Sequence, residues 1–186
     1  KEVGIPEDRV SSYPDELSGG QRQRIMIAMS IACEPSILIA DEPTTALDVT
    51  VQAQVLELLA DLRKELGMAM VIITHDLGVV AGYTDRIAVM YGGEIVELAT
   101  TTDLFTDTKM PYTEALIKSI PRVDRKRGSE LSSIEGMPPD PTKVRASCGF
   151  ADRCPYAVQK CRDEHPQLVD AGNGHSYRCF FPIGGK

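Results

Sequence analysis

Apolar residues along the first hundred positions follow two alternating patterns. Over 21–32 and 49–66 they recur every three or four residues, which is the spacing of one face of a helix. Over 36–40 and 68–74 they form short unbroken runs, which are typical of strands buried on both faces of a sheet. This succession of strand, helix and strand predicts a βαβ unit, in which the two strands are parallel and the connection is right-handed.

Beyond this unit the pattern is less regular. We expect a helix over 76–83 and, over 86–98, a hairpin of two strands with a Gly-Gly turn. A further short helix is expected over 112–120. Residues 121–145 are rich in proline, charge, serine and glycine, which indicates a linker or loop.

These patterns divide the chain into three regions. Residues 1–100 are expected to form part of an α/β domain with a mainly parallel sheet. Residues 101–147 are expected to be a helix and a linker. Residues 148–186 hold four of the five cysteines and are expected to form a small irregular domain.

Composition and charge narrow the classes of protein. The 186 residues are 42% hydrophobic and 25% charged, which is enough apolar content for a buried core. The net charge of −7, with no basic cluster beyond 122–127, excludes a general nucleic-acid binder. No apolar run reaches the roughly 18 residues that span a bilayer, and we see no signal-peptide pattern. Any role at a membrane is therefore expected to depend on a partner.

Polar side chains follow both predicted strands at their carboxyl ends, where parallel sheets bind ligands. Asp41 and Glu42 follow the first strand, and His75 and Asp76 follow the second. Because neighbouring strand positions point in opposite directions, one acid can face Mg²⁺ and the other a water molecule. Alternatively, the acids could be solvated or cap a helix, and the histidine could lie in the core.

The segment SGGQ at 18–21 begins the first predicted helix. Free N–H groups at a helix N-terminus bind anions, and glycines let a phosphate approach the backbone closely. The alternative is a surface helix that Ser18 caps.

Four short motifs occur together in this part of the chain: LSGGQ at 17–21, ILIADEPT at 37–44, ALD at 46–48 and ITHD at 73–76. In this order and spacing they resemble the motifs of ABC-type ATPases. The resemblance implies a partial nucleotide-binding domain of the P-loop NTPase type that works with ATP and Mg²⁺.

The resemblance also implies a role for each motif. Asp41 would hold Mg²⁺ through water, and Glu42 would be the general base that polarises the attacking water. His75 would contact the γ-phosphate, and Asp48 would lie at the seam between two ATPase subunits. These groups suffice for phosphoryl transfer, which depends on positioning and charge stabilisation. The signature motif would bind the γ-phosphate of ATP held by the other subunit, through Leu17, Ser18, Gly19, Gly20 and Gln21.

One part of the ABC pattern is missing from these residues. No GxxxxGK[ST] loop occurs, and the family's glutamine loop and adenine-stacking aromatic are missing too. Without the loop's amides and lysine, the chain cannot cradle its own ATP tightly. We therefore expect the C-terminal part of an ABC ATPase, which hydrolyses ATP in the intact protein and is inactive alone.

The segment MPYTEALIKSIPR at 110–122, followed by a cysteine-bearing tail, resembles the C-terminal extension of dipeptide and oligopeptide importer ATPases. That resemblance implies ATP-driven peptide uptake at the cytoplasmic face of the cell membrane. The implied partners are a second ATPase subunit, transmembrane permease subunits and, indirectly, an extracellular peptide-binding protein, and no nucleic acid. The alternatives are a nickel importer ATPase, a soluble ABC ATPase without a transport role, and a non-catalytic metal-binding interaction module.

The tail cysteines are spaced C-x₅-C-x₆-C-x₁₇-C and are candidate metal ligands: Cys148, Cys154, Cys161 and Cys179. Four thiolates suit an iron–sulfur cluster or zinc, and these intervals are wider than those of most zinc sites. The importer resemblance implies a [4Fe–4S] cluster in some members, so this cluster is the expected cofactor and zinc is the alternative. Disulfides are disfavoured in a reducing cytoplasm. The site is expected to staple the tail, with redox or iron sensing as the alternative.

Three other candidate ligands are assigned no such role. Cys33 is expected to be buried on an apolar helix face. His165 and His175 flank the cysteines and are expected to be surface residues.

Overall fold

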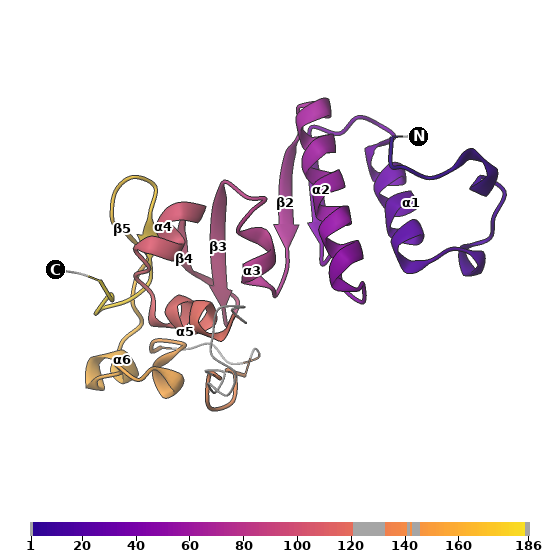
Figure 1. The fold of residues 1–186 in the computed structure, drawn as a ribbon. Coiled ribbons are helices and arrows are strands. Elements are labelled where there is room, and N and C mark those ends of the chain that lie inside the picture. The colour runs from indigo at the N-terminus through magenta and orange to yellow at the C-terminus, as the bar shows by residue number, and fades with distance from the viewer. Residues whose placement is uncertain (1, 121–132, 141, 143–145, 185–186) are drawn as a thin grey trace, which may run out of the picture. The chain divides into compact units, whose positions relative to one another are not determined.

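The computed structural model of the protein describes residues 2–120, 133–140, 142 and 146–184. The chain forms two compact units, Lys1–Tyr83 and Thr84–Lys186, which we call unit 1 and unit 2. The hairpin predicted over 86–98 therefore groups with the tail and not with the βαβ unit (Figure 1). The basic segment 122–127 and much of the predicted linker lie outside the described residues.

Unit 1 contains the predicted βαβ arrangement. Its two strands pair in parallel, from Ile37 opposite Ala69 to Asp41 opposite Ile73. The helix expected over 76–83 is only one turn long. In chain order, unit 1 contains 3₁₀ turns at Glu7–Arg9 and Pro14–Glu16, α1 (Gly19–Ile31), β1 (Ile37–Asp41), α2 (Val49–Leu66), β2 (Ala69–Ile73) and α3 (Leu77–Val80).

Apolar side chains of α1, α2 and one face of the sheet form the core of unit 1. Full burial of one such side chain contributes about 1.5–3 kcal/mol relative to exposure. Gly67 ends α2 with a left-handed φ of 62°, a conformation that a residue without a Cβ atom adopts at little cost. The buried core residues are Val3, Ile27, Ile31, Leu38, Val55, Leu59, Leu62 and Met68.

The prediction that both strands are buried on both faces is wrong for this structure. Ile37 is 61% exposed and Ile39 is 66% exposed, whereas Leu38 between them is buried. Val71 and Ile73 of β2 are also about half exposed. The physical reason is that, within residues 2–83, packed side chains cover only one face of this sheet, so that alternate residues remain in contact with solvent.

Unit 2 is built on an antiparallel sheet with the strand order β3-β4-β6-β5. The predicted hairpin is confirmed, and it turns at Gly92 and Gly93, both with positive φ. The mainly parallel sheet of the sequence-based prediction is therefore confirmed only for the two strands of unit 1. Unit 2 contains β3 (Arg86–Tyr91), β4 (Glu94–Thr100), α4 (Thr101–Thr106), α5 (Pro111–Ser119), a 3₁₀ turn at Ala151–Arg153, α6 (Gln159–Asp163), β5 (Val169–Asp170) and β6 (Ser176–Tyr177).

A buried carboxylate joins three segments of unit 2. Glu97 of β4 is fully buried and accepts hydrogen bonds from the backbone N–H groups of Lys109 and Met110, at 2.6 Å and 3.1 Å. Its Oε1 also lies 2.9 Å from Nε2 of His175. A buried carboxylate is stable only when such partners replace its lost water. The tail is therefore anchored to β4 both by this pair and by the strand pairing of β4 with β6.

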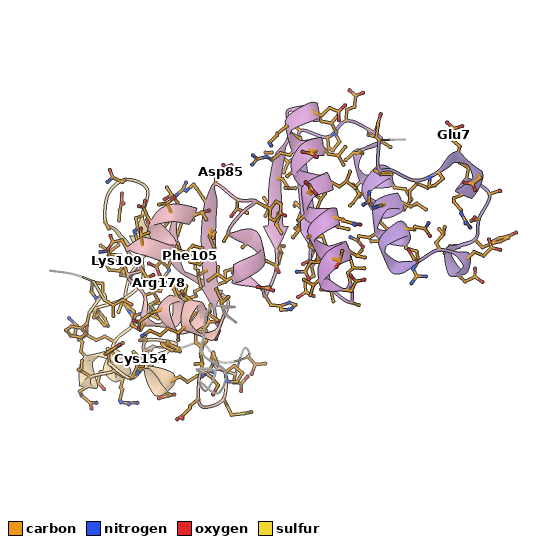
Figure 2. The ribbon with its side chains drawn as sticks, in the orientation of Figure 1. Glu7, Asp85, Phe105, Lys109, Cys154 and Arg178 are labelled. Carbon is orange, nitrogen blue, oxygen red and sulfur yellow. The ribbon has the colours of Figure 1, made fainter. Side chains whose placement is uncertain are left out.

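The prediction that both tail histidines are surface residues is wrong. His175 is 5% exposed, because its ring packs beside Glu97. His165 is partly buried, and its Nε2 lies 2.8 Å from Oε2 of Glu94. Arg178 adds hydrogen bonds to the carbonyl oxygens of Ile95 and Pro166 (Figure 2). The tail is thus attached through polar contacts as well as through the buried ring of Phe150, which packs on Tyr91.

Within the described ranges, no helix is long and apolar enough to cross a membrane.

Candidate functional site

The carboxyl ends of β1 and β2 bring together the predicted acids and the predicted histidine. Glu42 follows β1, and its backbone N–H donates to the carbonyl oxygen of Ile73 at the end of β2, at 2.8 Å. Nδ1 of His75 lies 3.3 Å from Oε1 of Glu42. Parallel pairing produces this meeting, since it places the ends of both strands at one edge of the sheet.

Glu42 departs from the strand conformation that precedes it. Its φ of 44° lies in the left-handed region, which costs a residue with a Cβ atom about 1–3 kcal/mol. The Thr45 hydroxyl donates to Oε2 of Glu42 at 2.8 Å. Hydrogen bonds from Thr45 and then from His75 hold the pKa of Glu42 below its ordinary value, so the carboxylate is ionised at neutral pH.

Asp41 presents a different environment from Glu42. It is the last residue of β1 and is exposed. Its carboxylate has no hydrogen-bond partner among the described residues, which leaves its oxygens free to accept from water bound to a cation. The two neighbouring acids are thus chemically distinct, one held by protein donors and one open.

The segment SGGQ at 18–21 forms the N-terminus of α1, where two of its residues form a capping box. The Ser18 side chain accepts from the backbone N–H of Gln21 at 3.2 Å, and the Gln21 side chain accepts from the N–H of Ser18 at 3.0 Å. An ordinary serine cap is therefore present, and the N–H groups of Gly19 and Gly20 lie in the first turn, where a helix has no internal acceptor. Both interpretations of SGGQ remain compatible with this geometry.

The glycines of this segment also have a packing role. A Cβ atom on Gly20 would lie 2.7 Å from Cγ1 of Val51 on α2, and one on Gly19 would lie 3.4 Å from Cδ2 of Leu47. Leu17, just before the cap, is buried. In residues 2–83, no hydrogen bond joins this segment to Asp41, Glu42 or His75.

Asp48 caps α2. Its Oδ1 accepts from the backbone N–H groups of Thr50 and Val51, each at 3.0 Å. These hydrogen bonds give Asp48 a structural role, because its side chain accepts from N–H groups that have no acceptor within the helix.

Four cysteines of the tail line one small cavity in unit 2, which Figure 2 locates by the label on Cys154. Burial raises the pKa of Cys148 and Cys154, and it raises the pKa of Cys179 to about 11, so these three thiols are protonated at neutral pH. No group of three or more His, Cys, Asp or Glu side chains in the described ranges is arranged to hold a metal ion. The cavity is lined by Met110, Pro111, Cys148, Phe150, Ala151, Cys154, Tyr156, Cys161, Cys179, Phe180 and Phe181.

Cys33 lies elsewhere, and the prediction that it is buried is wrong. It is exposed, because α1 ends at Ile31 and the chain turns away from the apolar helix face before Cys33.

Sequence reasoning missed two features of these sites. Thr45 bonds to Glu42 from three positions away, and the short turn that joins them could have indicated it, because Thr side chains in turns often bond to near neighbours. Glu97 and His175 are 78 positions apart in the sequence, and no local sequence pattern indicates that they pair.

Comparisons with known proteins define the class first. A family model described as ABC transporter matches residues 1–45. The structure of cbiO1 from Clostridium perfringens, part of the ABC transporter complex cbiONQ, is similar with a TM-score of 0.53 and 35% identity, over 57% of this chain and 42% of that one. Unit 1 is therefore similar to part of the ATP-binding proteins of ABC transporters.

The particular family follows from the rest of the chain. A model described as "Oligopeptide/dipeptide transporter, C-terminal region" matches residues 96–161. A probable peptide ABC transporter ATP-binding protein, y4tR of Sinorhizobium fredii, is 52% identical over 96% of this chain and 53% of its own length. The dipeptide transport ATP-binding protein DppD of Bacillus subtilis is 48% identical over the same shares. The chain belongs to the family of peptide ABC transporter ATP-binding subunits, and it spans about half the length of these relatives.

Proposed function

We propose that the intact protein binds and hydrolyses ATP to drive the import of dipeptides or oligopeptides. The observation that carries the proposal is the meeting of Glu42 and His75 at the ends of two parallel strands, in a chain whose residues 96–161 match the peptide-transporter model. The comparison proteins are named for peptide transport, which favours peptides over nickel as the substrate.

Each site residue has a role in this proposal. The open carboxylate of Asp41 suits Mg²⁺ held through water, and the metal would supply charge neutralisation at the phosphates. Glu42 orients and polarises the attacking water, and His75, whose Nδ1 faces Glu42, contacts the γ-phosphate.

The first turn of α1 would act on a nucleotide held by a second subunit. Its N–H groups and the positive end of the helix dipole favour a phosphate, and the exposed Ser18 hydroxyl adds a polar group. The proposed partners are thus a second ATPase subunit and, for transport, permease subunits at the cytoplasmic face of the membrane that receive peptide from an external binding protein. Asp48 would lie near the seam between the two ATPase subunits while capping α2.

ATP hydrolysis by these 186 residues alone is not expected. They contain no GxxxxGK[ST] loop, and the comparison proteins are about twice as long. The proposal therefore concerns the protein as it occurs at full length.

We further propose that the tail cysteines hold a [4Fe–4S] cluster that staples the tail. Support comes from the four thiols that line one cavity, although no three are arranged for a single ion. A cluster carries its four thiolates on four different metal atoms, so its ligands lie farther apart than those of one zinc ion. Because burial raises the pKa of Cys148, Cys154 and Cys179, binding of a cluster as thiolates would release protons from these residues.

The central test replaces Glu42 in the full-length subunit assembled with its permease in vesicles. Glu42→Gln should lower ATP hydrolysis at least about a hundredfold, because the amide cannot act as a base, while ATP binding is retained. Uptake of a labelled dipeptide, supplied with its binding protein, should be lost in parallel.

Glu57→Gln, on the exposed face of α2, is the matched control and should leave both rates unchanged. Hydrolysis at the normal rate by Glu42→Gln would overturn the assigned base. Normal hydrolysis by the wild-type protein without peptide uptake would overturn the transport assignment.

A further inference from the structure

The backbone of Glu42 is fixed on both sides. Before it, β1 pairs with β2 as far as Asp41, and the N–H of Glu42 extends this pairing to the carbonyl oxygen of Ile73. After it, the carbonyl oxygen of Glu42 accepts from the N–H of Thr45 at 3.1 Å, which closes a four-residue turn. The left-handed φ of 44° at Glu42 changes the direction of the chain between these two contacts.

The two carboxylate oxygens of Glu42 have different partners. Oε1 faces the ring of His75 at 3.3 Å, and Oε2 accepts from the Thr45 hydroxyl at 2.8 Å. A carboxylate held at one oxygen only can still rotate about its last side-chain bond, because that torsion is broad. With the Thr45 hydroxyl on one oxygen and the Nδ1–H tautomer of His75 on the other, the plane of the carboxylate is set, and the remaining lone pairs have fixed directions.

The Thr45 hydroxyl is well suited to this task. The side chain is exposed, and its bond to Glu42 is the one hydrogen bond that its hydroxyl makes among the described residues. The turn itself is closed by the backbone, so the hydroxyl is not needed to form it. Its evident contact is therefore the carboxylate of the proposed base.

We propose that Thr45 is a positioning residue that orients the Glu42 carboxylate toward the attacking water. The inference rests on the proposed ATPase function, and it deepens that function by adding a residue that acts through Glu42. A general base works only when its lone pair points at the proton it takes, so rotation of the carboxylate lowers the rate of the chemical step more than it affects nucleotide binding.

The test uses the full-length subunit in its complex and measures kcat and KM for ATP. Thr45→Val keeps the shape of the side chain and removes the hydroxyl, and we expect kcat to fall by about tenfold with KM within about twofold of wild type. Thr45→Ser keeps the hydroxyl, and we expect it to retain kcat within about twofold.

The matched control is Thr50→Val in the first turn of α2. Thr50 is exposed, and its hydroxyl makes no hydrogen bond in the part of the chain that the structure describes, so its loss should leave kcat unchanged. Wild-type kcat in Thr45→Val, an equal loss in Thr45→Ser, or an equal loss in Thr50→Val would each overturn the inference.

These outcomes are separable from failure of the proposed function. If wild type is inactive, the proposed ATPase function is overturned, and if Glu42→Gln retains full hydrolysis, the assigned base is wrong. In both cases Thr45 loses its proposed role. If Glu42→Gln is inactive and Thr45→Val is normal, the function stands and only the positioning role is overturned.

Discussion

At the scale of single residues, unit 1 shows side chains that serve a local structural need at positions expected to serve catalysis. Ser18 and Gln21 form a capping box, and Asp48 caps α2. Such contacts explain these residues without any ligand. Glu42 is different, because its carboxylate caps no helix and is instead held between the Thr45 hydroxyl and the ring of His75. These contacts bring together side chains that the catalytic proposal needs, and they make Glu42 the stronger functional candidate.

Gly20 gives a residue-scale prediction about stability. Gly20→Ala would place a Cβ atom 2.7 Å from Cγ1 of Val51, a β-branched side chain with little rotamer freedom in a helix. We expect the change to lower the free energy of unfolding of the full-length protein by about 1–3 kcal/mol, measured by urea denaturation.

Two variants check the cause of that loss. Combining Gly20→Ala with Val51→Ala should restore much of the lost stability, since the second change removes the opposing methyl groups. Gly19→Ala, whose Cβ atom would meet Leu47 at 3.4 Å, should cost little. A fully stable Gly20→Ala protein would show that α1 is free to move away from α2.

At the scale of elements, the spacing of apolar residues and the turn residues predicted those helices and strands whose formation depends on residues close together in the sequence. The spacing of apolar residues over 49–66 identified α2 with its bounds, and the Gly-Gly turn identified the hairpin β3–β4. The exposed faces of β1 and β2 were not predicted, because an apolar run shows what a strand can bury and not what covers it. The two-residue strands β5 and β6 were missed, because two residues are too few to show the alternation of apolar and polar side chains that is typical of a strand.

The same distinction applies to the candidate sites. Asp41, Glu42 and His75 could be predicted because motifs mark them and parallel strands bring their ends together. The contact of Glu97 with His175 could not, because a buried pair formed by residues far apart in the chain depends on tertiary packing. Glutamate is normally found at the surface unless it is paired, so its residue type gives no sign of burial.

Glu97 gives the element-scale prediction. Glu97→Ala removes the acceptor of two backbone N–H groups and the partner of His175, and leaves the N–H of Met110 and the ring of His175 buried without this partner. We expect a loss of about 3–5 kcal/mol in the free energy of unfolding, measured on the full-length protein. Glu94→Ala, at a partly exposed contact with His165, should cost less than about 1 kcal/mol. Equal costs would show that burial of Glu97 is not what makes it important.

At the scale of the whole molecule, unit 2 combines a hairpin, two helices and a tail that lacks a large core of its own. The tail is held by β4, by polar contacts and by the walls of the cysteine cavity. A small region of this kind commonly depends on a metal or a disulfide for stability. This is the physical reason to expect the proposed cluster to be structural.

The prediction at this scale concerns the metal content of the full-length protein purified without oxygen. We expect broad absorption near ~400 nm, with about four irons and four sulfides per chain. Cys154→Ser should lose most of the iron and lower the melting temperature, whereas Cys33→Ser, at the exposed cysteine of unit 1, should lose neither. One zinc per chain without iron would contradict the cluster. A protein that holds no metal, and whose melting temperature is unchanged by Cys154→Ser, would contradict a metal site that stabilises the tail.

The uncovered face of the two-stranded sheet has a practical consequence for handling the protein. Ile37, Ile39, Val71 and Ile73 present an apolar surface to water, on strands that each have one unpaired edge within the described residues. Such a surface is a template on which other chains can add strands and precipitate. Expression of these 186 residues by themselves is therefore expected to favour inclusion bodies, and a loss of activity in such a preparation would reflect aggregation and not catalysis.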